Sequence, residues 1–181
     1  MLPYWTRGTV QPYAGPATRP WLKYDLVFEN LTYRLPSGEP EQVDLNNIRE
    51  FTLGDSLLKT QRTYRRYLNA RIENPALRLA FFEVRYDAGQ TALLCRRSLV
   101  ENAVHTRGSQ RSGQFQQRVV TKYFIKTPDN RLTPTELTQE AVLAALDSPH
   151  AVAVAAHIKQ KRLKLTEEAD VVELLAYYDT L

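Results

Sequence analysis

Apolar and polar residues alternate through much of the first 130 residues, which is the period of two that a half-buried β-strand requires. The clearest example is the segment 80–86, whose intervening polar residues include Glu83 and Arg85. Its alternating apolar positions are Ala80, Phe82, Val84 and Tyr86. Because 87–90 has the composition of a turn and 91–97 is largely apolar again, the pattern predicts a β-hairpin.

Further strands are expected on both sides of this hairpin. The earlier segments that suit a strand are 8–13, 21–24, 26–35 and 48–53. After the hairpin, apolar residues alternate from Val119 to Ile125. The polar segment 101–117 is expected to be a mobile loop. Since each strand is short, the pattern favours a small antiparallel meander or a partial barrel.

The period changes to that of a helix in the last third of the chain. Thr133-Pro134-Thr135-Glu136 has the pattern of a capping box with proline at the first helical position, and Thr138 is a rival start. Asp147-Ser148-Pro149 should end this helix, with Ser148 as the N-cap of a second helix that runs to about Leu163.

A third helix is expected after Thr166, which would cap it, with Glu167, Glu168 and Asp170 in its first turn. One face of this helix is an apolar stripe with the spacing i, i+3, i+4 and i+7, which predicts burial against a neighbour. The residues of the stripe are Val171, Leu174, Leu175 and Tyr178.

These patterns together predict an α+β fold in a single domain, residues 1–181. An antiparallel strand-rich part would cover 1–132, and a three-helix part would cover 133–181. No run of about 18 apolar residues is present, so no transmembrane segment is expected. The segment from Met1 to Tyr13 has no apolar core of a secretory signal, although a signal removed from a longer precursor would leave no trace here.

The net charge of +4 is unevenly distributed. Residues 1–58 carry 5 basic and 7 acidic side chains, residues 59–126 carry 14 and 4, and residues 127–181 carry 5 and 9. The basic middle could face nucleic acid, anionic lipid or an acidic partner. Alternatively, the acidic ends neutralise it within the fold.

Arginines and tyrosines are interleaved in this basic middle, and further cations follow on later strands. Arginine side chains bind phosphates or carboxylates, and tyrosine rings stack on bases or sugars. The candidate ligand-binding residues are Arg62, Tyr64, Arg65, Arg66, Tyr67, Arg96, Arg97 and Lys122. The alternative is a solvated sheet edge or a set of ion pairs with the acidic helices.

Residues typical of catalysis are sparse. Cys95 lies in an apolar strand, where a buried thiol is expected rather than a nucleophile, and it has no second cysteine for a disulfide. His105, His150 and His157 lack metal-ligand spacing, and no glycine-rich phosphate loop is present, so no metal or cofactor is expected. Glu83 is expected to pair with Arg96 or Arg97. An enzyme with a dispersed site is therefore the weakest alternative.

Four segments resemble a family of uncharacterised exported proteins of Gram-negative bacteria, whose members carry a signal peptide and have no assigned activity. They are Gly8-Thr9-Val10 with Leu22-Lys23-Tyr24-Asp25, Phe82-Glu83-Val84 with Gly89 and Leu93-Leu94, Lys122-Tyr123-Phe124-Ile125 with Asp129-Asn130, and Leu175 to Leu181. This chain departs from the family in having no signal and unusually many arginines. The resemblance implies a periplasmic or envelope-associated location and carries over no catalytic residue.

The expected function is that of a non-enzymatic binding or structural domain of an exported or envelope-associated bacterial protein. Its partner would be a protein or a polyanionic ligand, bound through the strand-rich part. The alternative is a nucleic-acid-binding or polyanion-binding protein that uses the basic region 62–126, and a cytoplasmic location stays open.

Overall fold

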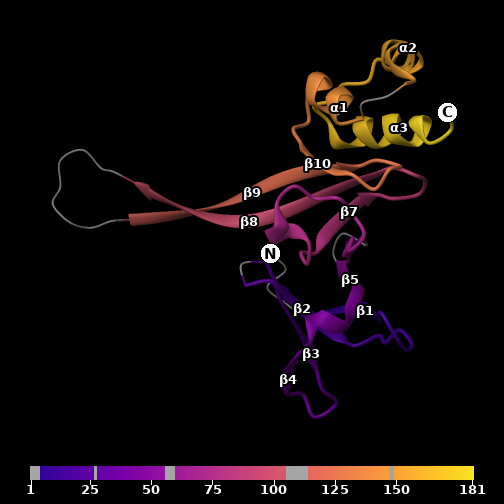
Figure 1. Ribbon diagram of the computed structural model, residues 1–181. Coiled ribbons are helices and arrows are strands. Elements are labelled where there is room, and N and C mark those ends of the chain that lie inside the picture. The colour runs from indigo at the N-terminus through magenta and orange to yellow at the C-terminus, as the bar shows by residue number, and fades with distance from the viewer. Residues whose placement is uncertain (1–4, 27, 56–59, 105–113, 147–148) are drawn as a thin grey trace.

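The computed structural model describes residues 5–26, 28–55, 60–104, 114–146 and 149–181. In these residues, ten antiparallel strands form one open sheet in the order β10-β9-β8-β7-β6-β5-β1-β2-β3-β4, and three helices follow them (Figure 1). The expected α+β fold, with strands first and helices last, is confirmed. The sheet is a long meander that does not close into a barrel.

The strands are β1 (Thr6–Pro12), β2 (Trp21–Asp25), β3 (Asn30–Arg34), β4 (Pro40–Gln42), β5 (Ile48–Asp55), β6 (Thr60–Arg65), β7 (Phe82–Tyr86), β8 (Ala92–Val104), β9 (Gln114–Lys126) and β10 (Leu132–Thr135). The helices are α1 (Gln139–Leu146), α2 (Ala151–Lys161) and α3 (Glu168–Tyr178). Two short 3₁₀ turns, Leu45–Asn47 and Pro75–Leu77, lie between strands.

The strand expected at 26–35 is wrong in its first half. The β2–β3 hairpin turns there: Glu29 has a left-handed φ of 52°, and the backbone N–H of Phe28 donates to the Asp25 carboxylate at 3.1 Å. This side-chain hydrogen bond offers the backbone an alternative to the ladder, so it outweighs the strand preference of Phe28. The strands expected at 8–13, 21–24 and 48–53 are confirmed.

The loop expected at 101–117 is wrong at both ends, because β8 continues to Val104 and β9 begins at Gln114. The remaining residues of that segment, 105–113, lie outside the described part of the chain. Backbone pairing runs in unbroken register from Ala92 opposite Lys126 to Val104 opposite Gln114. Polar residues do not prevent such a two-stranded ribbon, because hydrogen bonds between the two backbones hold it together. We call residues 96–104 and 114–122 the arm, whose outer half extends away from the rest of the molecule (Figure 1).

The capping box expected at 133–136 is also wrong, since three of its residues belong to β10. Pro134 is tolerated there because β10 is an edge strand, where a missing N–H breaks no ladder. The rival start is confirmed: α1 begins at Gln139, and the Thr138 hydroxyl accepts a hydrogen bond of 3.2 Å from the backbone N–H of Ala141.

The starts of the other two helices differ from expectation. α2 begins one residue after His150, which has no capping side-chain hydrogen bond, and the expected cap Ser148 lies outside the described residues. α3 begins after Glu167 rather than Thr166, so the cap expected at Thr166 is wrong by one residue. α2 ends two residues before the expected Leu163, because Arg162 adopts a left-handed φ of 55°.

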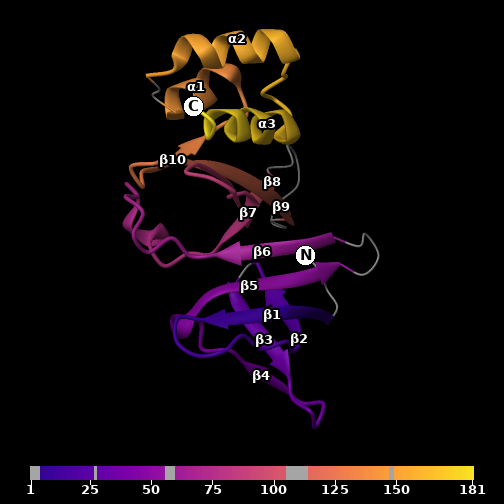
Figure 2. The same ribbon diagram turned by 90° about the vertical axis from the view of Figure 1, so that its right-hand side faces the viewer.

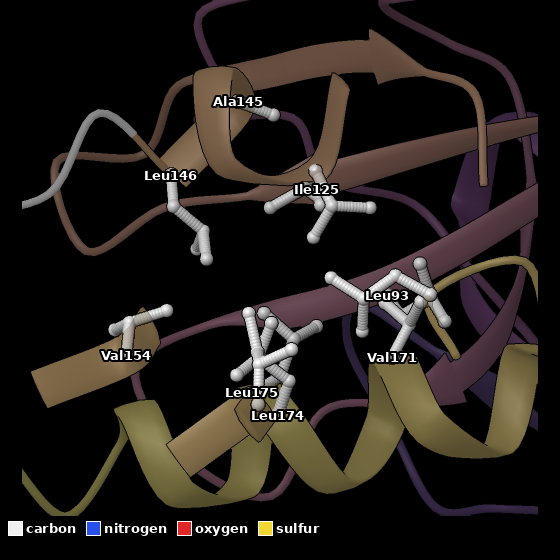
Figure 3. Close-up of a cluster of buried hydrophobic side chains, with 11 residues drawn as sticks. Leu93, Ile125, Ala145, Leu146, Val154, Val171, Leu174 and Leu175 are labelled. Atoms are coloured by element: carbon white, nitrogen blue, oxygen red, sulfur yellow. The ribbon is translucent and has the colours of Figure 1, made fainter. Parts of the chain in front are cut away.

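The apolar stripe of α3 packs on the sheet as expected. Val171, Leu174 and Leu175 are fully buried in a cluster that also contains Leu93, which lies next to Val171, and Ile125, which lies next to α1 (Figure 3). The helices cover the sheet at its β8–β10 end, and β1 to β4 lie at the opposite end (Figure 2). Each such side chain contributes about 1.5–3 kcal/mol of burial free energy, so this docking fixes the helical part on the sheet.

A second core stabilises the opposite end of the sheet, where Tyr24, Phe51 and Phe81 form edge-to-face ring contacts. A third, around Phe82 and Phe124, lies beneath β7 and β9. None of the helices in the described residues is long and apolar enough to cross a membrane.

Candidate binding site

The arginines expected to form one basic surface are largely neutralised within the fold. Arg65 pairs with Glu50 and Asp87, and Arg96 pairs with Glu29. An Nη1–Oε2 distance of 2.7 Å joins Arg97 to Glu83. The partners come from neighbouring strands and turns of the sheet. These three residues therefore form internal ion pairs, although their partners lie on the sheet and not on the acidic helices as expected.

The expected stacking surface of Tyr64 and Tyr67 does not form. Tyr64 is only 4% exposed and stacks on Phe51 with ring centroids 4.9 Å apart, and burial raises its pKa to about 12. The Tyr67 hydroxyl donates to Asp87 at 2.8 Å. The guanidinium of Arg66 lies 4.3 Å above the Phe81 ring. These side chains therefore contribute to the packing of the fold instead of forming an exposed surface.

The other two candidates are Arg62 and Lys122. Arg62 is half-buried on β6 and hydrogen-bonds the Tyr64 side chain. Lys122 is exposed on the arm, opposite Arg96 in the β8–β9 register. The eight candidates are therefore divided among aromatic rings with the arginines that contact them, a set of ion pairs and one exposed lysine.

The alternation of 80–86 places Glu83 on the polar face of the strand, but the structure buries it. Its side chain lies between two arginines and is only 2% exposed. Arg85 approaches it at 2.8 Å and Arg97 at 2.7 Å, so the expected pairing with Arg97 is confirmed. Arg85 also pairs with Glu168 on α3, which in turn accepts a hydrogen bond of 3.0 Å from Tyr123. This network joins the sheet to α3 and leaves Glu83 occupied on both oxygens.

Cys95 is fully buried opposite Glu83, and burial raises the pKa of its thiol to about 12. The expected burial of Cys95 is confirmed. A thiol that stays protonated is a poor nucleophile, so low reactivity stays a prediction. No group of three or more His, Cys, Asp or Glu side chains in the described part of the chain is placed to hold a metal ion.

A different set of residues forms a surface that sequence reasoning missed. Arg7, Trp21 and Arg34 lie side by side on β1, β2 and β3, because Arg7 pairs with Trp21 and Trp21 pairs with Arg34 in the strand registers. Their neighbour Leu22 faces the core and is completely buried, so the alternation of β2 directs Trp21 outward. Trp21 is 42% exposed. The position of Trp21 thus lies between those of two arginines on one face of the sheet.

Rings and backbone carbonyls hold the two arginines in place. The guanidinium carbon of Arg7 lies 4.7 Å from the Trp21 ring centroid, and that of Arg34 lies 5.9 Å from the Trp5 ring. Arg7 donates to the carbonyl of Arg19 at 3.2 Å, and Arg34 donates to that of Gly38 at 3.1 Å. Neither forms an ion pair with a described carboxylate, in contrast to the arginines of the central strands. Their charges are available to a ligand.

The row borders a groove with a volume of about 1010 Å³. Its apolar walls come from Val10, Pro20, Leu35, Pro36 and Val43. A concave, mostly apolar site with a few convergent polar groups is typical of small-ligand binding. The neighbouring Tyr33 hydroxyl hydrogen-bonds Glu41, which raises the pKa of Tyr33. The Glu41 carboxylate thus has Tyr33 as its partner and not one of the arginines of the row.

No family model, no curated protein and no solved structure matches this chain. The chemistry of the groove is therefore the guide to its ligand.

Proposed function

We propose that this chain is a non-enzymatic binding domain that holds an acidic saccharide in the groove beside Arg7, Trp21 and Arg34. The observation that supports this most directly is the row itself. An exposed Trp21 with the Arg7 guanidinium at its ring has Arg34 beside it in the strand register, and neither arginine has a described carboxylate as partner. The flat, CH-rich face of a sugar packs on an indole ring, and the carboxylate or sulfate of an acidic sugar accepts paired hydrogen bonds from guanidinium.

The lining of the groove favours binding over catalysis. Among the described residues that border it, the charged side chains are both arginines, and the hydroxyl groups are those of Thr18 and Tyr33. Acid–base chemistry needs a group that gains or loses a proton near neutral pH, such as a carboxylate or histidine beside the substrate. The groove presents donors and apolar surface, which recognise a ligand without transforming it.

The proposal includes an exported, envelope-associated location, which rests on the resemblance of the four segments described above. Acidic saccharides are abundant outside the cell membrane, so the ligand and the location are consistent with each other. Nucleic acid is the competing ligand class, since aromatic rings and arginines also bind single strands. It is the less suitable one, because the central arginines that would extend a phosphate track are paired internally.

The experiment is a calorimetric titration of the protein with an oligosaccharide that contains glucuronate and with a neutral oligosaccharide of equal length. We expect the acidic ligand to bind and the neutral one to bind much more weakly. Trp21→Ala and Arg34→Gln should each weaken binding by roughly tenfold, because each removes one recognition element worth about 1 kcal/mol or more.

Arg49→Gln is the matched control, since Arg49 is an exposed arginine on β5 outside the groove lining. It changes the net charge by the same amount as Arg34→Gln and should leave the affinity unchanged. Equal losses of affinity in Arg34→Gln and Arg49→Gln would show that only the net charge matters, and they would contradict a specific site in the groove. Tighter binding of single-stranded DNA than of the acidic saccharide, lost in Trp21→Ala, would replace the saccharide by nucleic acid.

A further inference from the structure

The outer edge of β9 is open along the arm. On one side, β8 pairs with β9 over its full length. On the other side, β10 pairs only with residues 123–126, from Thr135 opposite Tyr123 to Leu132 opposite Lys126. Residues 114–122 of β9 therefore have no strand neighbour on this side among the described residues. A long open edge with unpaired backbone groups is a template for another strand.

The register identifies the free backbone groups. The N–H of Thr127 donates to the carbonyl of Arg131 at 3.0 Å, so the backbone of residue 127 faces the β10 side. Because this direction alternates along an antiparallel strand, Ile125 and Tyr123 face the same side. The alternation continues into the open edge, where residues 115, 117, 119 and 121 direct their N–H and C=O groups outward. Pro134, which has no N–H, lies opposite Phe124 at a position that needs none.

A groove adjoins this edge where α1 crosses β9 and β10. Its volume is about 920 Å³. One wall is β9 from Val120 to Tyr123, and the opposite wall is the alanine-rich face of α1 with Ala141, Ala144 and Ala145. Small side chains leave room between the helix and the strand edge, so an apolar side chain from an added strand fits there. Val119, which is 54% exposed, extends the apolar surface outward.

Charge decides which kind of strand fits. Residues 114–126 carry three basic side chains and no acidic one, and two of them, Arg118 and Lys122, are exposed. A second copy of this chain, paired antiparallel through the same edge, would bring these cations close to their own copies, and like charges on paired strands destabilise a sheet. An acidic segment gains from the same side chains. The lining of the groove contains one carboxylate, Glu136, which directly follows the last β10 residue paired with β9.

We propose that the open edge of β9 binds an acidic, extended segment of a partner protein by strand addition. The added strand runs antiparallel to β9, in line with β10, and places an apolar side chain against α1. Main-chain hydrogen bonds to residues 119 and 121 hold it, and Arg118 and Lys122 select its acidic residues. This site is separate from the Arg7–Trp21–Arg34 groove, and neither requires the other.

A short synthetic peptide in which glutamate alternates with valine and leucine is a suitable probe, with a lysine version as the control peptide. We expect the acidic peptide to bind, the lysine peptide to show no binding, and hydrogen exchange at Val119 and Thr121 to slow in the complex. Thr121→Pro removes one outward N–H at an edge position that tolerates proline, and it should weaken binding by about tenfold or more. Thr121→Ala keeps that N–H and should bind like the parent.

Lys122→Glu should weaken binding by a similar factor, whereas Lys159→Glu, on exposed α2, changes the same charge far from the edge and should not. An unchanged affinity in Thr121→Pro, with its fold intact by circular dichroism, would overturn the proposal. Concentration-dependent self-association that Thr121→Pro abolishes would assign the edge to a second copy instead. Preference of the same edge for single-stranded DNA over the acidic peptide would also overturn it.

Discussion

Asp179, just beyond the end of α3, accepts a hydrogen bond of 2.9 Å from the backbone N–H of Thr91 at the start of the β7–β8 hairpin's second strand. Its other carboxylate oxygen accepts a hydrogen bond of 2.7 Å from the Tyr86 hydroxyl. Burial, together with this hydrogen bond, raises the pKa of Tyr86 to about 12. These two hydrogen bonds connect the hairpin to the end of the last helix, although the bonded residues are 93 and 88 positions apart in the sequence.

Asp179→Ala should destabilise the fold by about 1.5–3 kcal/mol, because it removes a charged acceptor from two donors. Chemical denaturation measures this change. Gly89→Ala should act in the same direction, since a Cβ there would lie 2.1 Å from the Asp179 carboxylate and displace it. Thr180→Ala, which removes a hydrogen bond within the terminal turn only, is the control and should cost much less. A wild-type midpoint for Asp179→Ala would show that the contact contributes nothing.

The docking of α3 predicts the effect of shortening a single buried side chain in the helical core. Leu174→Ala should cost about 2–5 kcal/mol, because Leu174 is fully buried and its removal leaves a cavity. Glu173→Ala on the exposed side of the same helix should change stability by less than about 0.5 kcal/mol. Removal of the chain after Lys164 deletes the whole stripe and should lower the melting temperature steeply. A truncated protein with an unchanged melting temperature would refute the packing role of α3.

Cys95 should react slowly with thiol reagents in the native protein and at the normal rate after denaturation. Its folded-state pKa of about 12 exceeds the ordinary value of 9.0, so the buried neutral thiol contributes stability that is fully present below about pH 9 and is lost as the pH rises toward 12. Cys95→Ala should cost about 1 kcal/mol through the cavity it leaves. Rapid labelling at pH 7 without unfolding would contradict the buried position.

Binding of simple polyanions through the basic middle should be weak. In the Trp21→Ala background, where the groove does not contribute, heparin and single-stranded DNA should bind with similar low affinity that falls further with salt. Base stacking worth roughly 1–3 kcal/mol per base would distinguish DNA, but Tyr64 is buried and Tyr67 is held by Asp87. Fluorescence anisotropy at two salt concentrations tests this. A clear preference for DNA that Tyr67→Ala removes would restore the predicted stacking surface.

The sequence alone determined the features that depend on local period. The hairpin turn at 87–90, the strand at 48–53, the stripe of α3 and the burial of Cys95 all follow from the spacing of apolar residues within a short window. The hydrophobic effect acts on each side chain according to the face it occupies, so a period of 2 or 3.6 residues identifies those faces without knowledge of the neighbours.

Competition between two local signals limited other predictions. The capping-box pattern at 133–136 is a valid helix start, yet its residues pair with β9 because the preceding turn directs them along that strand. The polar segments 101–104 and 114–117 suggest a loop, yet each strand of the arm satisfies the backbone of the other. In both cases pairing with the adjacent strand outweighed a local preference of about 1 kcal/mol per residue or less.

Only the tertiary structure decided which residues meet. Arg7, Trp21 and Arg34 come from three strands, and they form a row because the registers of β1, β2 and β3 align them. Glu83 is buried because Arg85 and Arg97 neutralise it there. Which side chains come into contact depends on strand register and on the curvature of the whole sheet. Both are set by many contacts between residues that are distant in the sequence. A local pattern predicts which face of a strand or helix a side chain occupies. Which residue lies next to it across the sheet depends on how the rest of the chain folds.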